Sequence, residues 1–382
     1  MLKKILIAIG LVILLLLGSV GVALVATAPV PPMTGSQSAD WLRPGDLAVA
    51  STSQVFVDPS RPTQSNGLFP GAPERTFEVQ MWYPTELLGS HPLVVYSHGF
   101  MSNNRGGTYL AEALAGHGYV VIAANYPLTH GGAPGGAYVG DVVNQAADVS
   151  FLIDSVLALT GADKPFSGEI DVSRIGVAGL SLGGLTSTLV GFHPRWRDPR
   201  ISAVVSIAGP ASMFLTEFFA HAPRPFMMVA GNIDAIVPYV GNADDITARV
   251  ADSTLVTIDA GSHVGFADVA EPYMRWMENP DEMGCQAITA AISSSSERRA
   301  NPFEGLGGVA DGISFDGDGP ALCASLPLPP SLHPGRQHMI TQVAVLSFFE
   351  SHFAQDSDRR SAAAAVLAAH LAQDFPEVSV RR

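Results

Sequence analysis

The chain has 382 residues, 47% of them hydrophobic and 15% charged, a composition that supports a substantial buried core and excludes a chain disordered throughout. Its formal net charge is −14 and only 21 Lys and Arg residues are spread along it, so we expect no nucleic-acid partner. Length alone does not divide the chain into two domains, because single α/β domains with insertions reach this size.

The first predicted element is an uncharged apolar run over residues 5–28, which follows Lys3 and Lys4. As a helix it would measure about 36 Å, enough to cross a hydrocarbon core of ~30 Å. We therefore predict that residues 1–28 contain a membrane anchor, with everything beyond them on the non-cytoplasmic side. A cleaved signal is the alternative, because residues 26–28 have the small-residue form of a cleavage site, although Pro29 follows it. Cleavage would give a secreted or periplasmic protein.

Residues 29–45 contain Pro, Ser and Gly and are predicted to form a tether to a domain over residues 46–382. In that domain short β-rich runs alternate with helical segments, which predicts an α/β fold with a mainly parallel sheet flanked by helices. The first two strands, at 53–57 and 76–84, are expected to be antiparallel. Further strands are expected at 91–99, 119–127, 174–179, 201–209, 224–231 and 253–260, and helices at 107–118, 141–159 and 338–353.

A glycine-rich turn follows the strand at 174–179, in the sequence RIGVAGLSLGG. Gly179 and Gly183 allow a sharp bend, and Ser181 lies at its tip, before a predicted helix. At this position a serine hydroxyl is presented at the carboxyl edge of the sheet, close to a helix N-terminus. Because a hydroxyl is a weak nucleophile at neutral pH, catalysis by Ser181 would require a base and an orienting acid.

Both partners follow in the chain, each at the carboxyl end of a predicted strand. Asp234 comes after the strand at 224–231, and His263 comes after the strand at 253–260. The order serine, acid, histidine predicts a catalytic triad of Ser181, Asp234 and His263. Asp259 is the rival acid, but it is too near His263 in sequence to reach around it. A turn-capping role is the alternative for Asp234.

The loop after the first parallel strand is expected to help hold a tetrahedral oxyanion. We predict that the backbone N–H groups of Phe100 and Leu182 are the two donors. His98 is expected to shape this loop rather than transfer protons. Solvated side chains are expected for three histidines in helical patterns, His117, His193 and His352.

Four motifs together resemble the α/β-hydrolase superfamily: SHGF (97–100), GLSLGG (179–184), GNIDAIVP (231–238) and GSHVGF (261–266). Within it, the chain resembles the platelet-activating-factor acetylhydrolase-like and predicted dienelactone-hydrolase-like branch, and more distantly the cutinase-like polyester hydrolases. The resemblance covers roughly residues 50–266 and the helix at 338–353. It implies an α/β-hydrolase fold, although dienelactone hydrolases proper use a cysteine where this chain has Ser181.

These observations predict a serine carboxylic-ester hydrolase that forms an acyl-enzyme and needs no cofactor and no metal. A thioesterase or acyltransferase with the same triad is an alternative, and a catalytically silent binding domain is an alternative of another class. The expected substrate is a small-molecule, lipid or polyester ester with an apolar acyl part. The residues predicted to line its site are Met101, Ile236, Val237, Val264 and Phe266.

An insert over about residues 267–337 separates His263 from the closing helix and contains both cysteines. We predict a disulfide between Cys285 and Cys323 if the domain is exported, with two free buried thiols as the alternative. The insert is either a partial lid at the rim of the active site or a decoration on the far surface.

Overall fold

A computed structural model describes residues 27–86, 89–159, 161–294, 301–315, 321–324 and 327–382 of the chain. Within these residues, nine strands form one sheet in the spatial order β1-β2-β4-β3-β5-β6-β7-β8-β9. Strands β3 to β8 run parallel, whereas β1, β2 and β9 enter through antiparallel pairs. The strands are β1 Val49–Asp58, β2 Arg75–Pro84, β3 Ser90–Ser97, β4 Val120–Ala124, β5 Glu169–Leu180, β6 Ile201–Ile207, β7 Phe226–Gly231, β8 Ser253–Ile258 and β9 Val378–Arg381.

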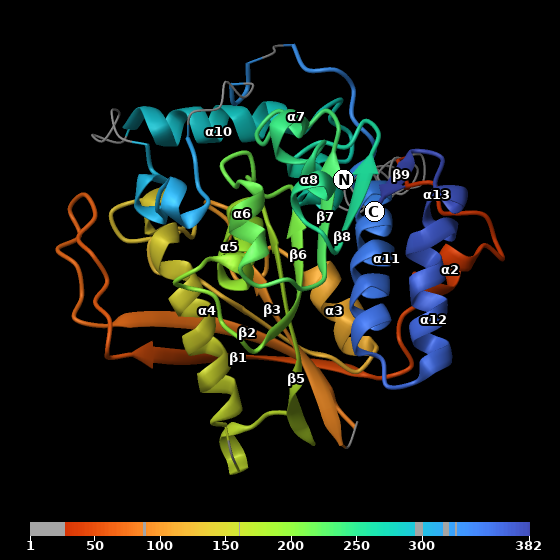
Figure 1. Ribbon diagram of the computed structural model, residues 1–382, viewed down its shortest axis with the longest axis horizontal. Helices are drawn as coiled ribbons and strands as arrows, with labels where there is room; N and C mark the ends of the chain where they lie inside the picture. The colour runs from red at the N-terminus through yellow and green to blue at the C-terminus, as the bar shows by residue number, and fades with distance from the viewer. Residues whose placement is uncertain (1–26, 87–88, 160, 295–300, 316–320, 325–326) are drawn as a thin grey trace, which may run out of the picture.

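Helices cover both faces of this sheet (Figure 1). Side chains of β4 alternate between two buried clusters: Val120 and Ile122 pack with α4 and α5, while Val121 and Ala123 pack with α3 and α11. This period of two is what a strand buried on both faces requires. The helices are α2 Gln37–Trp41, α3 Thr108–Gly116, α4 Val142–Leu157, α5 Leu182–Phe192, α6 Thr216–Ala220, α7 Tyr239–Asn242, α8 Ile246–Arg249, α9 Ala270–Met274, α10 Asp281–Ser294, α11 Pro334–Phe353, α12 Ser357–Ala365 and α13 Leu371–Asp374. The predicted parallel sheet flanked by helices is therefore confirmed.

The predicted membrane segment, residues 5–28, lies outside the described residues except at its last two positions. Among the helices that the structure does describe, none combines the length and the apolar character needed to cross a bilayer. Part of the expected tether, residues 29–45, packs on the domain instead of extending from it. Trp41 of α2 is buried, the Ser38 N–H donates to Asp374, and Arg336 donates to the carbonyl of Val30.

The insert contains α9 and α10, and its later part, residues 301–315, packs against the cluster formed with α5 and α6. In Figure 1, α10 lies at the top of the view, with one end beside α7, and Gly284 near its start packs on Ile236 and Val264. Beyond it, Leu306 and Ile313 are fully buried and join the cluster formed with α5 and α6. The insert uses the core of the domain because it has too few apolar residues for one of its own. The insert therefore contacts both the loops near His263 and the core beside α5 and α6.

Elements after residue 353 extend the fold beyond the predicted closing helix. Helices α12 and α13 pack near α11, and β9 pairs antiparallel with β8. The N–H of Asp259, directly after β8, donates to the carbonyl of Glu377 just before β9. The edge of β8 that would otherwise be open is thus covered, next to the loop that carries His263.

Candidate active site

Ser181 lies between the buried end of β5 and the first turn of α5. Its backbone has φ 56° and ψ −119°, a conformation that L-residues other than glycine rarely adopt. The strain is held from both sides, because the Ser181 N–H donates to Ile207 of β6 at 2.8 Å and its carbonyl accepts from Leu185 of α5 at 3.0 Å. The predicted strand, turn and helix are present, with a half-buried serine at the tip.

Close backbone contacts explain why glycine flanks this turn. A Cβ atom at Gly183 would lie 1.9 Å from the carbonyl oxygen of Ser97, so the first turn of α5 packs directly against the end of β3. A Cβ at Gly99 would lie 3.4 Å from the Cβ of Ser181, which places the loop after β3 beside the serine. The two segments expected to supply the oxyanion donors therefore meet at Ser181.

The expected oxyanion donors follow these contacts in sequence. In the described part of the chain, no protein acceptor takes a hydrogen bond from the N–H of Phe100 or from that of Leu182. Leu182 is also the first residue of α5, where an N–H has no partner within the helix. Two backbone donors next to Ser181 are thus available to a substrate oxygen.

His98 shapes the loop that carries Phe100. Its Nε2 accepts the N–H of Tyr126 at 3.3 Å, so its Nδ1 carries the proton and donates to the carbonyl of Gly99 at 2.8 Å. Burial lowers the pKa of His98 to about 4, which keeps the ring neutral. These contacts fit a residue that fixes a backbone turn.

Asp234 and His263 lie in the loops after β7 and β8 and are joined by a hydrogen bond. The Nδ1 atom of His263 lies 2.7 Å from Oδ2 of Asp234, and each residue is only 6% exposed. The other carboxylate oxygen, Oδ1, accepts the N–H groups of Ile236 at 2.9 Å and Val237 at 2.7 Å. Asp234 therefore caps its own turn with one carboxylate oxygen and bonds to the ring of His263 with the other.

The electrostatics of this pair favour a basic imidazole. Burial by itself would lower the pKa of His263, but the carboxylate of Asp234, its hydrogen bond and the charge of Asp281 raise it above the ordinary value of 6.5. The rival acid, Asp259, is exposed and accepts a hydrogen bond from Asn232 at 2.7 Å, with no hydrogen bond to His263. His263 thus has one orienting carboxylate, that of Asp234.

Ser181, Asp234 and His263 lie at the same edge of the sheet, because β5, β7 and β8 are parallel and the three residues follow their carboxyl ends. The hydrogen bonds of the described residues join Asp234 to His263 but do not include a bond from Ser181 to His263. Such bonds are often long in the absence of substrate and tighten when it binds.

The residues predicted to line an acyl site lie in different surroundings. Met101 is 40% exposed beside the Phe100 loop. A Cβ at Gly284 of α10 would lie 2.7 Å from the Ile236 side chain and 2.6 Å from that of Val264, so the insert packs on both. Phe266 requires a correction: it is 1% exposed and belongs to the cluster formed with α3 and α11, so core packing accounts for it. Val237 is half-buried in the Asp234 loop.

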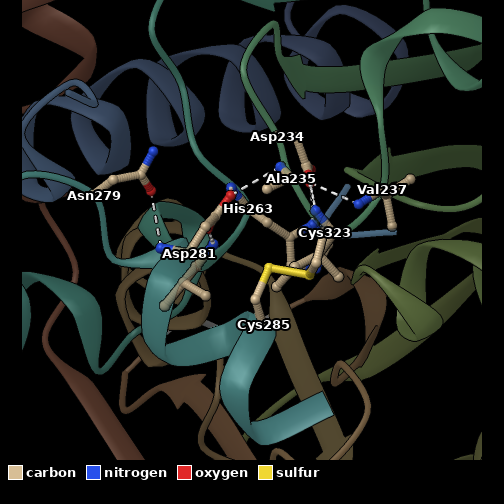
Figure 2. Close-up of a disulfide and its surroundings, with 10 residues drawn as sticks. Asp234, Ala235, Val237, His263, Asn279, Asp281, Cys285 and Cys323 are labelled. Atoms are coloured by element: carbon tan, nitrogen blue, oxygen red, sulfur yellow. Dashed lines mark hydrogen bonds and ion pairs between the residues drawn. A yellow bond between two sulfur atoms is a disulfide. The ribbon is translucent and has the colours of Figure 1, made fainter. Parts of the chain in front are cut away.

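The insert is tied to the loops that carry Asp234 and His263 (Figure 2). The predicted disulfide between Cys285 and Cys323 is present. Asp281, which the sequence analysis did not single out, is fully buried between the two loops and accepts backbone N–H groups from both. Its only signal in the sequence is an acidic residue at the start of a helix, which is common and not specific.

Within the described residues, no group of three or more His, Cys, Asp or Glu side chains is arranged to hold a metal ion.

The model of the PET hydrolase-like family matches residues 76–279, more than half of the chain. Among solved structures, a ferulic acid esterase from Streptomyces cinnamoneus is similar, with a TM-score of 0.54 and 19% sequence identity. The match covers 88% of this chain and 97% of the esterase chain, and at this identity it shows the shared α/β-hydrolase fold alone. No curated protein matches the sequence at a significant level.

Proposed function

The chain belongs to the PET hydrolase-like family of α/β-hydrolase serine carboxylic-ester hydrolases, and we propose that Ser181, Asp234 and His263 are its nucleophile, acid and base. The observation that carries this proposal is the 2.7 Å hydrogen bond from His263 Nδ1 to Asp234, at the sheet edge where Ser181 has strained backbone angles. A histidine oriented by a buried carboxylate, beside a serine on a sharp strand-to-helix turn, is the arrangement that nucleophilic acyl transfer requires.

In the first half-reaction, Nε2 of His263 takes the proton of the Ser181 hydroxyl while Oγ bonds to the ester carbonyl carbon. The carbonyl oxygen becomes an oxyanion that accepts the N–H groups of Phe100 and Leu182. His263 then gives the proton to the leaving alcohol oxygen as the C–O bond breaks, which leaves an acyl-Ser181. Asp234 accepts a hydrogen bond from the Nδ1–H group throughout, without taking the proton, and stabilises the transient imidazolium.

In the second half-reaction, water attacks the acyl carbon while His263 takes one of its protons. The proton passes to Oγ of Ser181 as the acyl–oxygen bond breaks, and the carboxylic acid leaves. We propose water as the acceptor, and an ester with an apolar acyl part as the substrate class. The exposed Met101 beside the donor loop supports the apolar preference.

The test is covalent labelling combined with a series of substrates. A fluorophosphonate probe should label the folded wild-type protein and not the Ser181→Ala variant, because the probe phosphonylates an activated serine. The kcat/KM values for p-nitrophenyl esters from two to sixteen carbons should then define the acyl length. Absence of labelling on folded wild-type protein would favour a binding domain, and acyl transfer to an added alcohol in preference to water would favour an acyltransferase.

We also propose that the enzyme acts outside the cytoplasm. The disulfide supports export, because disulfides persist in oxidising compartments. The apolar run over residues 5–28 follows two lysines and supports either an anchor or a signal. An anchored protein should stay with the membrane fraction through a high-salt wash, whereas a mature soluble form beginning near Pro29 would show a cleaved signal.

A further inference from the structure

Asp281 is a buried carboxylate with no role in the steps above. It is the first residue of α10 and is fully buried. Its Oδ2 atom accepts the N–H of Ala235 at 3.0 Å and the N–H of His263 at 2.9 Å, and its Oδ1 atom accepts the N–H of Val264 at 2.7 Å. Among the described residues, no basic side chain forms a salt bridge with it. Three backbone donors therefore satisfy this buried charge.

These contacts differ from those of an ordinary acidic residue in the first turn of a helix. Such a residue accepts N–H groups of its own helix, or interacts with the helix dipole at the surface. The donors to Asp281 instead belong to two other segments: Ala235 follows Asp234 directly, and His263 and Val264 belong to the loop after β8. One carboxylate thus bridges the loops that carry the proposed acid and base.

The disulfide extends this bridge into a closed ring of contacts (Figure 2). The carbonyl of Ala235 accepts the N–H of Cys323 at 2.7 Å, while the N–H of the same residue donates to Asp281. Cys323 is bonded to Cys285, one turn along α10 from Asp281. The N–H and the C=O of Ala235 are therefore both bound by the insert, through Asp281 and Cys323. The disulfide joins α10, which carries Asp281, to the segment that carries Cys323.

We infer that Asp281 is a positioning residue for the acid–base pair, and this inference rests on the proposed function. Its three hydrogen bonds fix the separation of the two loops, so that Nδ1 of His263 stays on Asp234. Its negative charge also favours the imidazolium that forms in each half-reaction. Among the described residues, the charged groups that act on His263 are Asp234 and Asp281. Against burial, which lowers the pKa of His263, both of these carboxylates raise it.

The test compares three variants of the full chain on p-nitrophenyl acetate. Asp281→Asn keeps the size of the side chain and removes its charge. Asp281→Glu keeps the charge and displaces the carboxylate. Asp259→Asn is the matched control, because Asp259 is also close to His263 in sequence but its carboxylate bonds to Asn232. Asp281→Asn should lower kcat by about 10- to 100-fold with little change in KM, because the reacting groups are misplaced. It should also move the acidic limb of the kcat/KM profile to lower pH.

Asp281→Glu should lower kcat but leave the acidic limb of the kcat/KM profile near its wild-type pH. If Asp281→Asn does not fold, the fall in kcat of Asp281→Glu is the test. Asp259→Asn should change neither quantity. Wild-type kcat in both Asp281 variants, or a lower melting temperature with an unmoved pH limb in folded Asp281→Asn, would overturn the positioning role. Fluorophosphonate labelling of the wild-type protein tests the proposed function separately. If the wild type is labelled at Ser181 but the Asp281 variants behave like wild type, only the positioning role fails.

Discussion

The proposed nucleophile and the proposed acid–base pair both lie at the carboxyl ends of the parallel strands but are held in place by different means. Ser181 is fixed by neighbours in the sheet itself: a hydrogen bond to β6, the first turn of α5, and the glycine contact with the end of β3. Asp234 and His263 stand on loops that a distant segment joins through Asp281 and the disulfide.

The two sides differ in which parts of the chain supply the contacts that fix these side chains. On the nucleophile side the contacts come from a short glycine-rich turn and from the neighbouring strands of the sheet, through Ile207 of β6 and Ser97 of β3. On the acid–base side they come from residues that follow His263 by many positions, in a part of the chain with little core of its own. The two sides should therefore respond differently to substitution.

The largest effect is expected at the nucleophile. Ser181→Ala and Ser181→Gly should each lower kcat/KM for p-nitrophenyl acetate by about 10⁴-fold or more, because no acyl-enzyme can form. The glycine variant should be the more stable of the two by about 1 kcal/mol, since glycine adopts the positive φ of this position without strain. Kinetics and thermal unfolding check both statements. Activity of either variant within tenfold of wild type would reject Ser181.

The next effect is expected at the acid. Asp234→Asn should lower kcat by about 10³- to 10⁴-fold, because Nδ1 of His263 loses the acceptor that sets its tautomer. Asp259→Asn should leave kcat within a few-fold of wild type, as its carboxylate bonds to Asn232. Steady-state kinetics on both variants checks the ranking, and the opposite ranking would mean that Asp259 is the acid.

A smaller effect is expected from pH in the wild-type enzyme. The base must be neutral to accept a proton, so kcat/KM should be low in acid and rise as pH increases through the pKa of His263. Burial opposes protonation of His263, but Asp234 and Asp281 outweigh it, which places the midpoint above 6.5. A pH–rate profile on p-nitrophenyl acetate measures the midpoint. A rate independent of pH between 5 and 8 would contradict the assignment of His263.

The smallest effect on rate is expected from the disulfide. Replacing both Cys285 and Cys323 by serine should destabilise the fold by up to about 4 kcal/mol through unfolded-chain entropy. Because α10 packs on Ile236 and Val264 at the rim, kcat/KM for long-chain esters should fall several-fold while that for acetate changes less. A chain-length series and thermal unfolding check this. Equal losses on all chain lengths would show that the insert does not act as a lid.

The same difference between the Ser181 side and the Asp234–His263 side explains which features can be predicted from the sequence. Parallel strands and the turn at Ser181 have local signatures, since buried β-rich runs and spaced glycines act within a few residues. The insert has no such signature. His193 shows this plainly: its helix-end pattern suggests a solvated ring, yet the ring is buried, stacks on Trp196, and bonds to the carbonyl of Leu306 in the insert.

Asp281 could not be identified for a similar reason, because its three donors come from loops that meet only in the folded protein. Strand β9 and the helices before it were also missed, since an alanine-rich run and a four-residue strand carry little periodicity. The position of Phe266 soon after His263 predicts a place in the substrate site, whereas its side chain packs in the core. Proximity in sequence to a catalytic residue does not settle which way a side chain points.

Strand β9 determines which edge the sheet presents next to the loop of His263. Without it, β8 would present unpaired N–H and C=O groups that could pair with the sheet of another molecule, directly beside the loop of His263. The four residues Val378–Arg381 occupy those groups within the same chain, and Arg381 adds a charge at the border. The edge that the sheet then presents at this end is a strand of only four residues that carries Arg381, and short charged edge strands are poor templates for pairing with another chain.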